Sequence, residues 1–200
     1  MNARLAAGVL SAVLVAPLLQ GCFPVLAGGM AAGVLAIDDR RTLATQAEDK
    51  TIFAKAESRI GERFGDKVHI NVTSFNRRVL LTGEVPDDKT RAEIERVVGG
   101  VENVGNIVNE LQVAGISSLT ARTNDSIITG KVKGNFIDQR DMHANAFKVV
   151  TEASVVYLMG LVTRAEGDRA ASVAARTSGV KQVVKVFEYV TAVPQQPGTK

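Results

Sequence analysis

The chain has 200 residues, with 24 lysine and arginine residues against 21 aspartate and glutamate residues, and a single cysteine. A formal net charge of +3 is not the concentrated positive charge that a nucleic-acid groove needs, so composition gives no support to nucleic-acid binding. Tryptophan is absent and aromatic residues make up 4% of the chain, which removes the usual interfacial anchors and base-stacking platforms. One cysteine cannot form an internal disulfide.

The N-terminus combines one arginine with a short apolar run at 5–19. This run is too short to span a hydrocarbon core of ~30 Å and is typical of a cleaved secretory signal. The sequence Leu-Leu-Gln-Gly-Cys at 18–22 resembles the lipobox of bacterial lipoproteins, which implies cleavage before Cys22 and acylation of its thiol. We therefore expect a signal peptide at 1–21. The alternative, a buried thiol in a membrane helix over 5–37, conflicts with the prolines and glycines that interrupt this stretch.

A second apolar stretch, rich in glycine and alanine, follows at 23–37. Two interpretations stay open: an interfacial segment that supports the acyl anchor, or a flexible tether. The mixed-charge cluster at 38–41 comes next, and we expect it to be a solvated boundary whose opposite charges satisfy one another in water. The acylated N-terminus and tether together are expected to cover 22–47.

The rest of the chain carries an internal repeat with a period of about 76 to 79 residues, which suits a small α+β module. Apolar residues at four-residue intervals define one helix face in each copy: Ile52, Ala56 and Ile60, then Ile128, Val132 and Phe136. Asp49 and Asp125 stand three residues before these sets. We expect each carboxylate to cap the N-terminus of its helix.

Each copy continues into an expected β-hairpin. The paired strands are predicted at 68–72 and 79–85 in the first copy, and at 146–151 and 156–162 in the second. Gly83 and Gly160 stand two residues before the end of the second strand. Glycine within a strand marks a bulge or a close backbone approach, so we expect both to be structural.

A second helix and a final strand complete each copy. The helices are expected to end at Gly100 and Gly179, in the αL conformation that favours glycine, and these two glycines are interpreted as equivalent structural positions. The final strands are predicted at 104–113 and 183–190. Each copy is therefore an α+β fold in the order αββαβ, with a three-stranded sheet covered on one face by two helices.

These residues resemble the BON domain. The resemblance lies in Leu-Thr-Gly-Glu-Val at 81–85 with Gly-Val-Glu-Asn-Val at 100–104, and in Leu-Met-Gly-Leu-Val at 158–162 with Gly-Val-Lys-Gln-Val at 179–183. It implies two tandem BON-like domains, at 48–114 and 123–191, joined by a short link near 114–123. The polar tail at 192–200 is expected to be disordered.

A lipobox followed by two BON domains resembles the dual BON-domain outer-membrane lipoproteins of Gram-negative bacteria. The resemblance implies a lipid anchor at Cys22 on the periplasmic face of the outer membrane, because Phe23 is not the aspartate that retains lipoproteins in the inner membrane. It also implies a role in outer-membrane integrity. One family member binds anionic phospholipid through the first helix of its second BON domain.

The corresponding helix in this chain is expected at 124–137, and it supplies the candidate lipid-binding residues: Ile127, Gly130, Lys131, Lys133 and Gly134. Helix geometry turns Ile127 about 100° away from Ile128 and places Lys131 one turn beyond it, so an apolar residue and a cation share an outer stripe. Ile127 stands where the phospholipid-binding member carries an aromatic anchor. The alternative is that Ile127 packs against the other BON domain and that the lysines are ordinary surface charges.

No catalytic residue, metal site or cofactor is expected. His69 and His143 are the only histidines, and neither has a cysteine, histidine or carboxylate at a metal-ligand spacing. We therefore expect a non-enzymatic, lipid-anchored periplasmic protein that contacts anionic phospholipid through its second BON domain and supports outer-membrane integrity. The alternative is an envelope scaffold or stress protein that binds another protein or peptidoglycan through its BON surfaces.

Overall fold

The computed structural model describes residues 39–139 and 142–191. These residues belong to one compact unit, Asp38–Lys200. The expected signal peptide, the lipidation site at Cys22, the tether before residue 39 and the tail at 192–200 lie outside the described residues.

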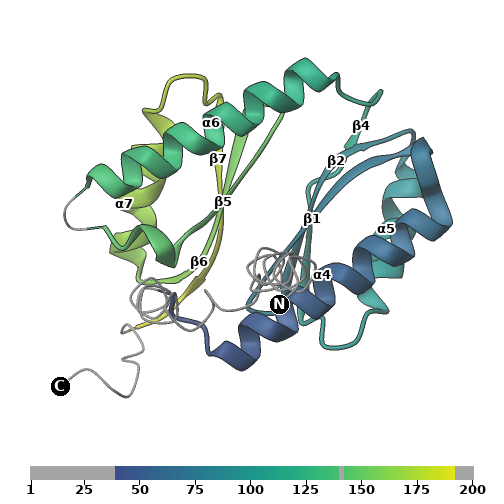
Figure 1. Ribbon diagram of the computed structural model, residues 1–200, viewed down its shortest axis with the longest axis horizontal. Coiled ribbons are helices and arrows are strands. Elements are labelled where there is room, and N and C mark those ends of the chain that lie inside the picture. The colour runs from purple at the N-terminus through teal and green to yellow at the C-terminus, as the bar shows by residue number, and fades with distance from the viewer. Residues whose placement is uncertain (1–38, 140–141, 192–200) are drawn as a thin grey trace, which may run out of the picture. The chain divides into compact units, whose positions relative to one another are not determined.

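Each copy of the repeat folds in the order helix, strand, strand, helix, strand (Figure 1), which confirms the predicted α+β fold. The first domain contains α4 (Leu43–Phe64), β1 (His69–Phe75), β2 (Arg78–Val85), α5 (Asp88–Gly99), β3 (Asn106–Asn109) and β4 (Gln112–Val113). The second contains α6 (Leu119–Asp138), β5 (Lys148–Glu152), β6 (Val155–Val162), α7 (Arg164–Ala175) and β7 (Gln182–Tyr189). Short 3-10 helices at Gly65–Lys67 and Ala144–Ala146 precede the two hairpins.

Both sheets combine an antiparallel hairpin with a parallel last strand. β1 pairs with β2, which pairs in parallel with β3 and β4; the second sheet has the order β5-β6-β7. A tight turn is enough to join antiparallel strands, whereas a parallel strand needs a longer crossover, which α5 and α7 supply. The single final strand predicted for the first domain is split at Leu111, whose backbone N–H donates to the Asn109 side chain at 3.2 Å.

The first helix of each domain begins earlier than predicted and is not capped by the expected aspartate. Thr42 and Ser118 are the N-cap residues, and each hydroxyl accepts from the backbone N–H three residues later, at 3.1 and 3.2 Å. Asp49 and Asp125 instead lie inside α4 and α6, and both are buried. The predicted capping role was therefore wrong.

Each buried aspartate holds the turn of its own β-hairpin. Asp49 accepts from the backbone N–H groups of Asn76 and Arg77 at 2.7 and 2.8 Å, and Asp125 accepts from those of Ala153 and Ser154 at 3.0 and 2.8 Å. All four turn residues have positive φ angles, between 51° and 67°, in the left-handed region that non-glycine residues rarely adopt. The carboxylate satisfies the N–H groups that this turn leaves without a strand partner, so it ties the helix to the hairpin.

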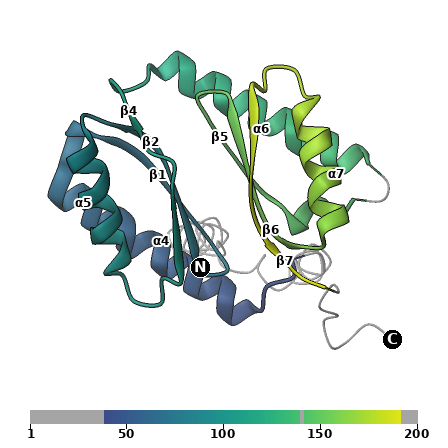
Figure 2. The ribbon, with the colours of Figure 1, turned by 180° about the vertical axis from the view of Figure 1, so that it is seen from behind.

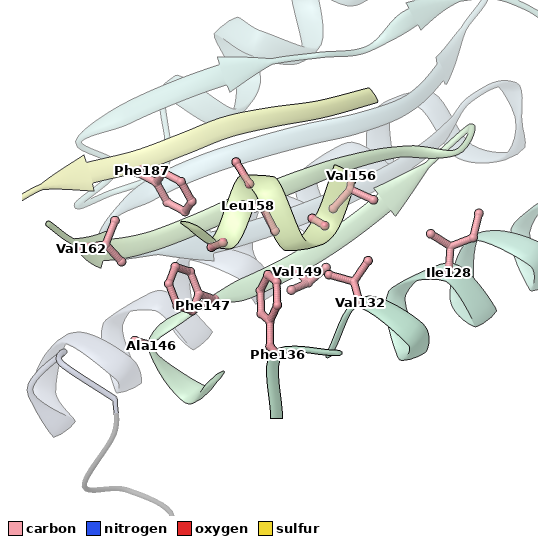
Figure 3. Close-up of a cluster of buried hydrophobic side chains, with 13 residues drawn as sticks. Ile128, Val132, Phe136, Ala146, Phe147, Val149, Val156, Leu158, Val162 and Phe187 are labelled. Atoms are coloured by element: carbon pink, nitrogen blue, oxygen red, sulfur yellow. The ribbon is translucent and has the colours of Figure 1, made fainter. Parts of the chain in front are cut away.

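One face of each sheet packs against its own two helices. In the second domain, Ile128, Val132 and Phe136 point from α6 toward the strands (Figure 3). The Phe136 and Phe147 rings meet edge to face with centroids 5.3 Å apart. The first domain repeats the arrangement with Ile52, Ala56 and Ile60 of α4. These are the apolar sets that the helical spacing predicted.

The opposite faces of the two sheets, which carry no helices, pack against each other, so that all four helices lie on the outside (Figures 1 and 2). The buried apolar residues of this interface are Phe75 and Leu80 from the first domain and Tyr157, Met159, Leu161 and Val186 from the second. Polar contacts also cross it: Asn71 Nδ2 donates to Glu152 Oε2 at 2.7 Å, and Asn76 Nδ2 donates to Glu188 Oε2 at 2.8 Å. The strands therefore bury side chains on both faces.

The charged segment before α4 is not the solvated boundary that the sequence predicted. The Arg40 side chain is 7% exposed and forms a bidentate ion pair with Glu166 at 2.5 and 2.9 Å, and it also donates to the Leu161 carbonyl oxygen. Arg41 pairs with Asp39 and with the buried Asp49, and its guanidinium lies 4.0 Å from the centre of the Phe75 ring. This segment therefore ties the beginning of the first domain to the second.

The in-strand glycines stand at close backbone approaches. Gly83 has a φ of +118°, and a Cβ atom there would lie 2.0 Å from the His69 carbonyl oxygen. A Cβ atom at Gly160 would lie 2.7 Å from the Ala146 carbonyl oxygen. Neither position has room for a side chain.

The predicted equivalence of Gly100 and Gly179 was wrong. Gly100 has a φ of −80° and is an ordinary helical C-cap, whereas Gly179 has a φ of +97° and lies in the loop after α7. The residue that matches Gly179 by its position before the last strand is Asn103, with a φ of +66°. Asparagine tolerates the left-handed region better than most residues, so it replaces glycine there.

Candidate functional site

Helix α6 covers the outer side of the second sheet and turns one long face away from the protein (Figure 1). Its buried residues, Asp125, Ile128, Val132 and Phe136, face the sheet. The opposite face carries Ile127, whose surface is 51% exposed, and the exposed Lys131 one turn later. Lys133 is exposed nearer the edge of this face. The structure thus brings the predicted candidate residues to the solvent side of α6.

The exposure of Ile127 decides between the two interpretations of its role in packing. The first domain contacts the second sheet through the helix-free face, and α6 lies on the other face of that sheet. Ile127 therefore does not pack against the first domain. A half-exposed isoleucine on the outer face of a helix is apolar surface available to something outside the described chain.

Two further apolar residues on this face were missed by the sequence analysis. Leu119 is 79% exposed at the N-terminal end of α6, and Ile137 is 72% exposed at its C-terminal end. They stand 18 residues apart, which is five whole turns, so they share one stripe about 80° around the helix from Ile127, and this spacing was present in the sequence. Gly130 and Gly134 lie between them. A Cβ atom added at either glycine would have no atom within 4 Å, so this stretch of the helix surface is open to solvent.

Positive charge continues from α6 to the neighbouring strand. The pKa of Lys148, at the beginning of β5, is lowered by burial and by the nearby charges of Lys133 and Arg41. Arg41 is neutralised by Asp39 and Asp49, but no ion pair of Lys131 or Lys133 is found within residues 39–139 and 142–191. The side of the second domain near α6 therefore presents apolar residues next to cations.

A group of polar side chains lies between the two domains, and the sequence did not predict it. His69 Nδ1 and Glu84 Oε2 are 2.9 Å apart, and Glu152 of the second domain lies next to them. Burial raises the pKa of Glu152; the Asn71 amide opposes this shift, and the charge of Glu84 adds to it. Sequence spacing gave no sign of this group, because both carboxylates reach His69 from other strands and one of them from the other repeat.

Comparison with known proteins assigns the chain to a family. The BON domain model matches residues 49–115 and 124–191. The chain is 37% identical over 175 residues to the outer membrane lipoprotein DolP of Haemophilus influenzae, an alignment that covers 86% of this chain and 90% of that protein. The chain belongs to the dual BON-domain outer-membrane lipoprotein family. It is therefore a lipid-anchored protein of the outer membrane with a role in the cell envelope.

Other family relatives carry different names. A 21 kDa hemolysin of Actinobacillus pleuropneumoniae is 30% identical over 154 residues, covering 76% of this chain and 79% of that one. The osmotically-inducible protein Y of Escherichia coli is 30% identical over 140 residues, covering 68% and 70%. Within the described ranges of this BON-domain lipoprotein, no helix is both long and apolar enough to cross a bilayer.

Proposed function

We propose that this BON-domain lipoprotein is a non-enzymatic binding protein that contacts anionic phospholipid through the outer face of α6 and so supports outer-membrane integrity. Acyl chains on Cys22 would hold the protein at the membrane, and α6 would supply a second, weaker contact. The observation that carries the proposal is the half-exposed Ile127 with Lys131 one turn away, on the helix face that turns away from the first domain.

The energetics of this face suit a weak and adjustable contact. Transfer of the exposed part of one isoleucine side chain out of water contributes about 1 kcal/mol, and each lysine near an anionic surface contributes about 1 kcal/mol more. Ile127, Lys131 and Lys133 together would then contribute about 3 kcal/mol, too little for stable attachment without the acyl anchor. The contact would therefore respond to the charge of the lipid surface.

Vesicle co-sedimentation of residues 38–200 tests the proposal. This fragment retains Arg40, whose ion pair with Glu166 joins the two domains, and Arg41, which pairs with Asp49. We expect it to bind vesicles that contain anionic phospholipid, to release them in high salt and to bind neutral vesicles poorly. The double variant Ile127→Asp/Lys131→Glu should lose this binding.

Helix α4 of the first domain offers a matched control, because Thr51 and Lys55 stand 76 residues before Ile127 and Lys131. The variant Thr51→Asp/Lys55→Glu makes the same charge change on the equivalent surface and should bind vesicles like the wild-type fragment. Failure of the wild-type fragment to bind any vesicle would contradict the proposal and favour the envelope scaffold. Equal losses in both double variants would show that overall charge, and not α6, controls binding.

A further inference from the structure

The interface between the two domains contains a group of metal-ligating side chains from three strands. His69 on β1 and Glu84 on β2 belong to the first domain, and Glu152 at the end of β5 belongs to the second. Each offers one nitrogen or oxygen atom, and these three atoms lie within 4.8 Å of one another. The β1–β2 register places His69 opposite Glu84, so the first two ligands are fixed by the backbone.

The two carboxylates are buried beside a single histidine, and within the described residues no lysine or arginine forms an ion pair with either of them. Glu84 is 5% exposed and Glu152 is 4% exposed. Glu152 Oε2 accepts from the Asn71 amide at 2.7 Å, and Glu84 Oε2 accepts from the Ser117 backbone N–H at 3.2 Å and lies 2.9 Å from His69 Nδ1. The Asn71 and Ser117 donors are neutral, and one imidazole can carry at most one positive charge, so burial of two carboxylates side by side is costly unless a further positive charge lies between them.

The cations at the rim of the group do not fill this role. Arg122 lines the cavity next to His69 and Glu152, and its guanidinium donates to the hydroxyl and the carbonyl of Ser117. The cavity has a volume of about 360 Å³ and also reaches Lys148. It gives a small ion a route to the group from solvent.

A buried hydroxyl without a hydrogen-bond partner lies on the same strand face as Glu84. The Oγ1 atom of Thr82 is buried and has no hydrogen-bond partner in the described part of the chain. Thr82 lies two residues before Glu84 on β2, so strand alternation puts both on the face that meets the second domain, and Thr82 pairs with Asn71 in the register. Buried polar side chains normally have a partner, and a water molecule bound to an ion would supply one.

We propose that His69, Glu84 and Glu152 bind one divalent transition metal ion, with Zn²⁺ preferred, that links the two BON domains. Imidazole nitrogen and carboxylate oxygen are both ligands of zinc, and three protein ligands with a water molecule in the fourth position complete a tetrahedron. Bonds of about 2.0 to 2.2 Å in a tetrahedron separate ligand atoms by about 3.3 Å. The His69 and Glu84 atoms, now 2.9 Å apart, need only a small separation to admit the ion.

Hydrogen bonds from neighbouring residues would orient the two carboxylate ligands. Asn71 would hold Glu152, and the Ser117 N–H would hold Glu84, so each carboxylate is oriented by a second contact. Since two ligands come from the first domain and one from the second, the bound ion would restrict separation of the two sheets. This inference does not depend on phospholipid binding, which is proposed for the outer face of α6 and uses none of these three ligands.

Zinc titration of the full chain in detergent tests the site. All proteins carry Cys22→Ser, so that the thiol is not a competing ligand, and are stripped of metal with a chelator before calorimetry. We expect one Zn²⁺ per chain with a dissociation constant in the micromolar range or below. Glu152→Gln, which keeps the size of the side chain, should weaken binding at least tenfold.

Glu188→Gln is the matched control. Glu188 also accepts from an asparagine amide across the interface, that of Asn76 at 2.8 Å, but it is not one of the three ligands. It should bind Zn²⁺ like the parent protein, as should His143→Ala. In thermal melting, Zn²⁺ should raise the Tm of the parent and of Glu188→Gln but not of Glu152→Gln, a readout that does not require a His69 variant to fold. Absence of binding below millimolar Zn²⁺, or equal affinity in Glu152→Gln, would overturn the proposal.

Discussion

Helices α4 and α6 carry equivalent residues on their inner faces and different residues on their outer faces. Both begin after a hydroxyl N-cap, both carry a buried aspartate that holds a hairpin turn, and both bury three further residues at four-residue intervals. On the outside, Thr51 and Glu57 of α4 stand where α6 has Ile127 and Lys133. Lys55 of α4 pairs with Glu102 at 3.2 Å.

This contrast separates the residues that the fold requires from those that it leaves free. The inner residues are constrained by close packing and by the hairpin that each aspartate holds. The outer residues contact little within the described chain, so the fold does not determine their identity. Leu43 and Phe53 of α4 are exposed as well, so the contrast on which the proposed lipid contact of α6 rests lies at Ile127 and Lys133.

The largest expected effect tests the shared inner face. Asp49→Asn and Asp125→Asn should each lower the free energy of unfolding by about 2 to 4 kcal/mol, because an amide cannot accept from two N–H groups with the strength of a carboxylate and can turn a donor toward them. Denaturant unfolding measures the loss. Glu102→Gln, which removes only the exposed pair with Lys55, should show none. If Asp125→Asn is as stable as the wild type, the anchor role is wrong.

The next effect concerns the contact between the first segment and the second domain. The hydrogen bond from Arg40 lowers the pKa of Glu166 to about 2 from an ordinary value of 4.5; burial opposes this shift and the Thr163 contacts add to it. Since the folded-state pKa is depressed, the stabilisation is complete above about pH 4.5 and is lost as the pH falls toward 2. It amounts to about 1 to 2 kcal/mol for a carboxylate that is still partly exposed.

Unfolding free energies measured between pH 6 and pH 2 check this dependence. The variant Arg40→Gln should start from a lower stability and lose less of it on acidification than the wild type. Parallel pH curves for the two proteins would contradict the assigned pair.

A smaller effect should sharpen the contrast between the outer faces. Ile127→Trp places an aromatic ring with an N–H group at headgroup depth, where such rings are favoured, and should strengthen binding to anionic vesicles about five- to tenfold. The same substitution at Thr51 should leave affinity unchanged. An equal gain from both substitutions would indicate non-specific insertion of tryptophan.

The smallest effects are expected at the open glycines of the two helices. Gly130→Ala and Gly134→Ala in α6, and Gly61→Ala in α4, should each raise the free energy of unfolding by up to about 1 kcal/mol, since no neighbouring atom lies within 4 Å of the added Cβ. Thermal melting measures the gain. Gly83→Ala should be strongly destabilising in the same assay, because its Cβ would overlap the His69 carbonyl.

The element order could be read from the sequence because the periodic apolar sets and the hairpins are local patterns. The helix starts were misplaced because aspartate is both a good N-cap and a good anchor for a turn. The partners that distinguish these roles for Asp49, at Asn76 and Arg77, lie more than 25 residues away. Gly100 and Gly179 were matched because each precedes a valine, but they stand 79 residues apart. The helices α5 and α7 and the loops after them correspond at a spacing of 76 residues, so these two glycines are not equivalent.

The outer face of α6 was partly predictable, and the interdomain contacts were not. Helical spacing alone placed Ile127 and Lys131 on one stripe, but whether the other domain covered that stripe depended on which faces of the two sheets meet. The same packing brings Glu152 to His69 and Glu166 to Arg40, over sequence separations that carry no local signal.

The central claim is that α6 lies against the lipid surface and α4 does not. Residues 38–200 contain no cysteine, so a single spin label can be attached through Ile127→Cys or, in the matched protein, through Thr51→Cys. On anionic vesicles, the account predicts that the label at 127 becomes accessible to lipid-soluble oxygen and protected from an aqueous relaxing agent, while the label at 51 stays in water. Equal aqueous accessibility at both positions on vesicle-bound protein would contradict it.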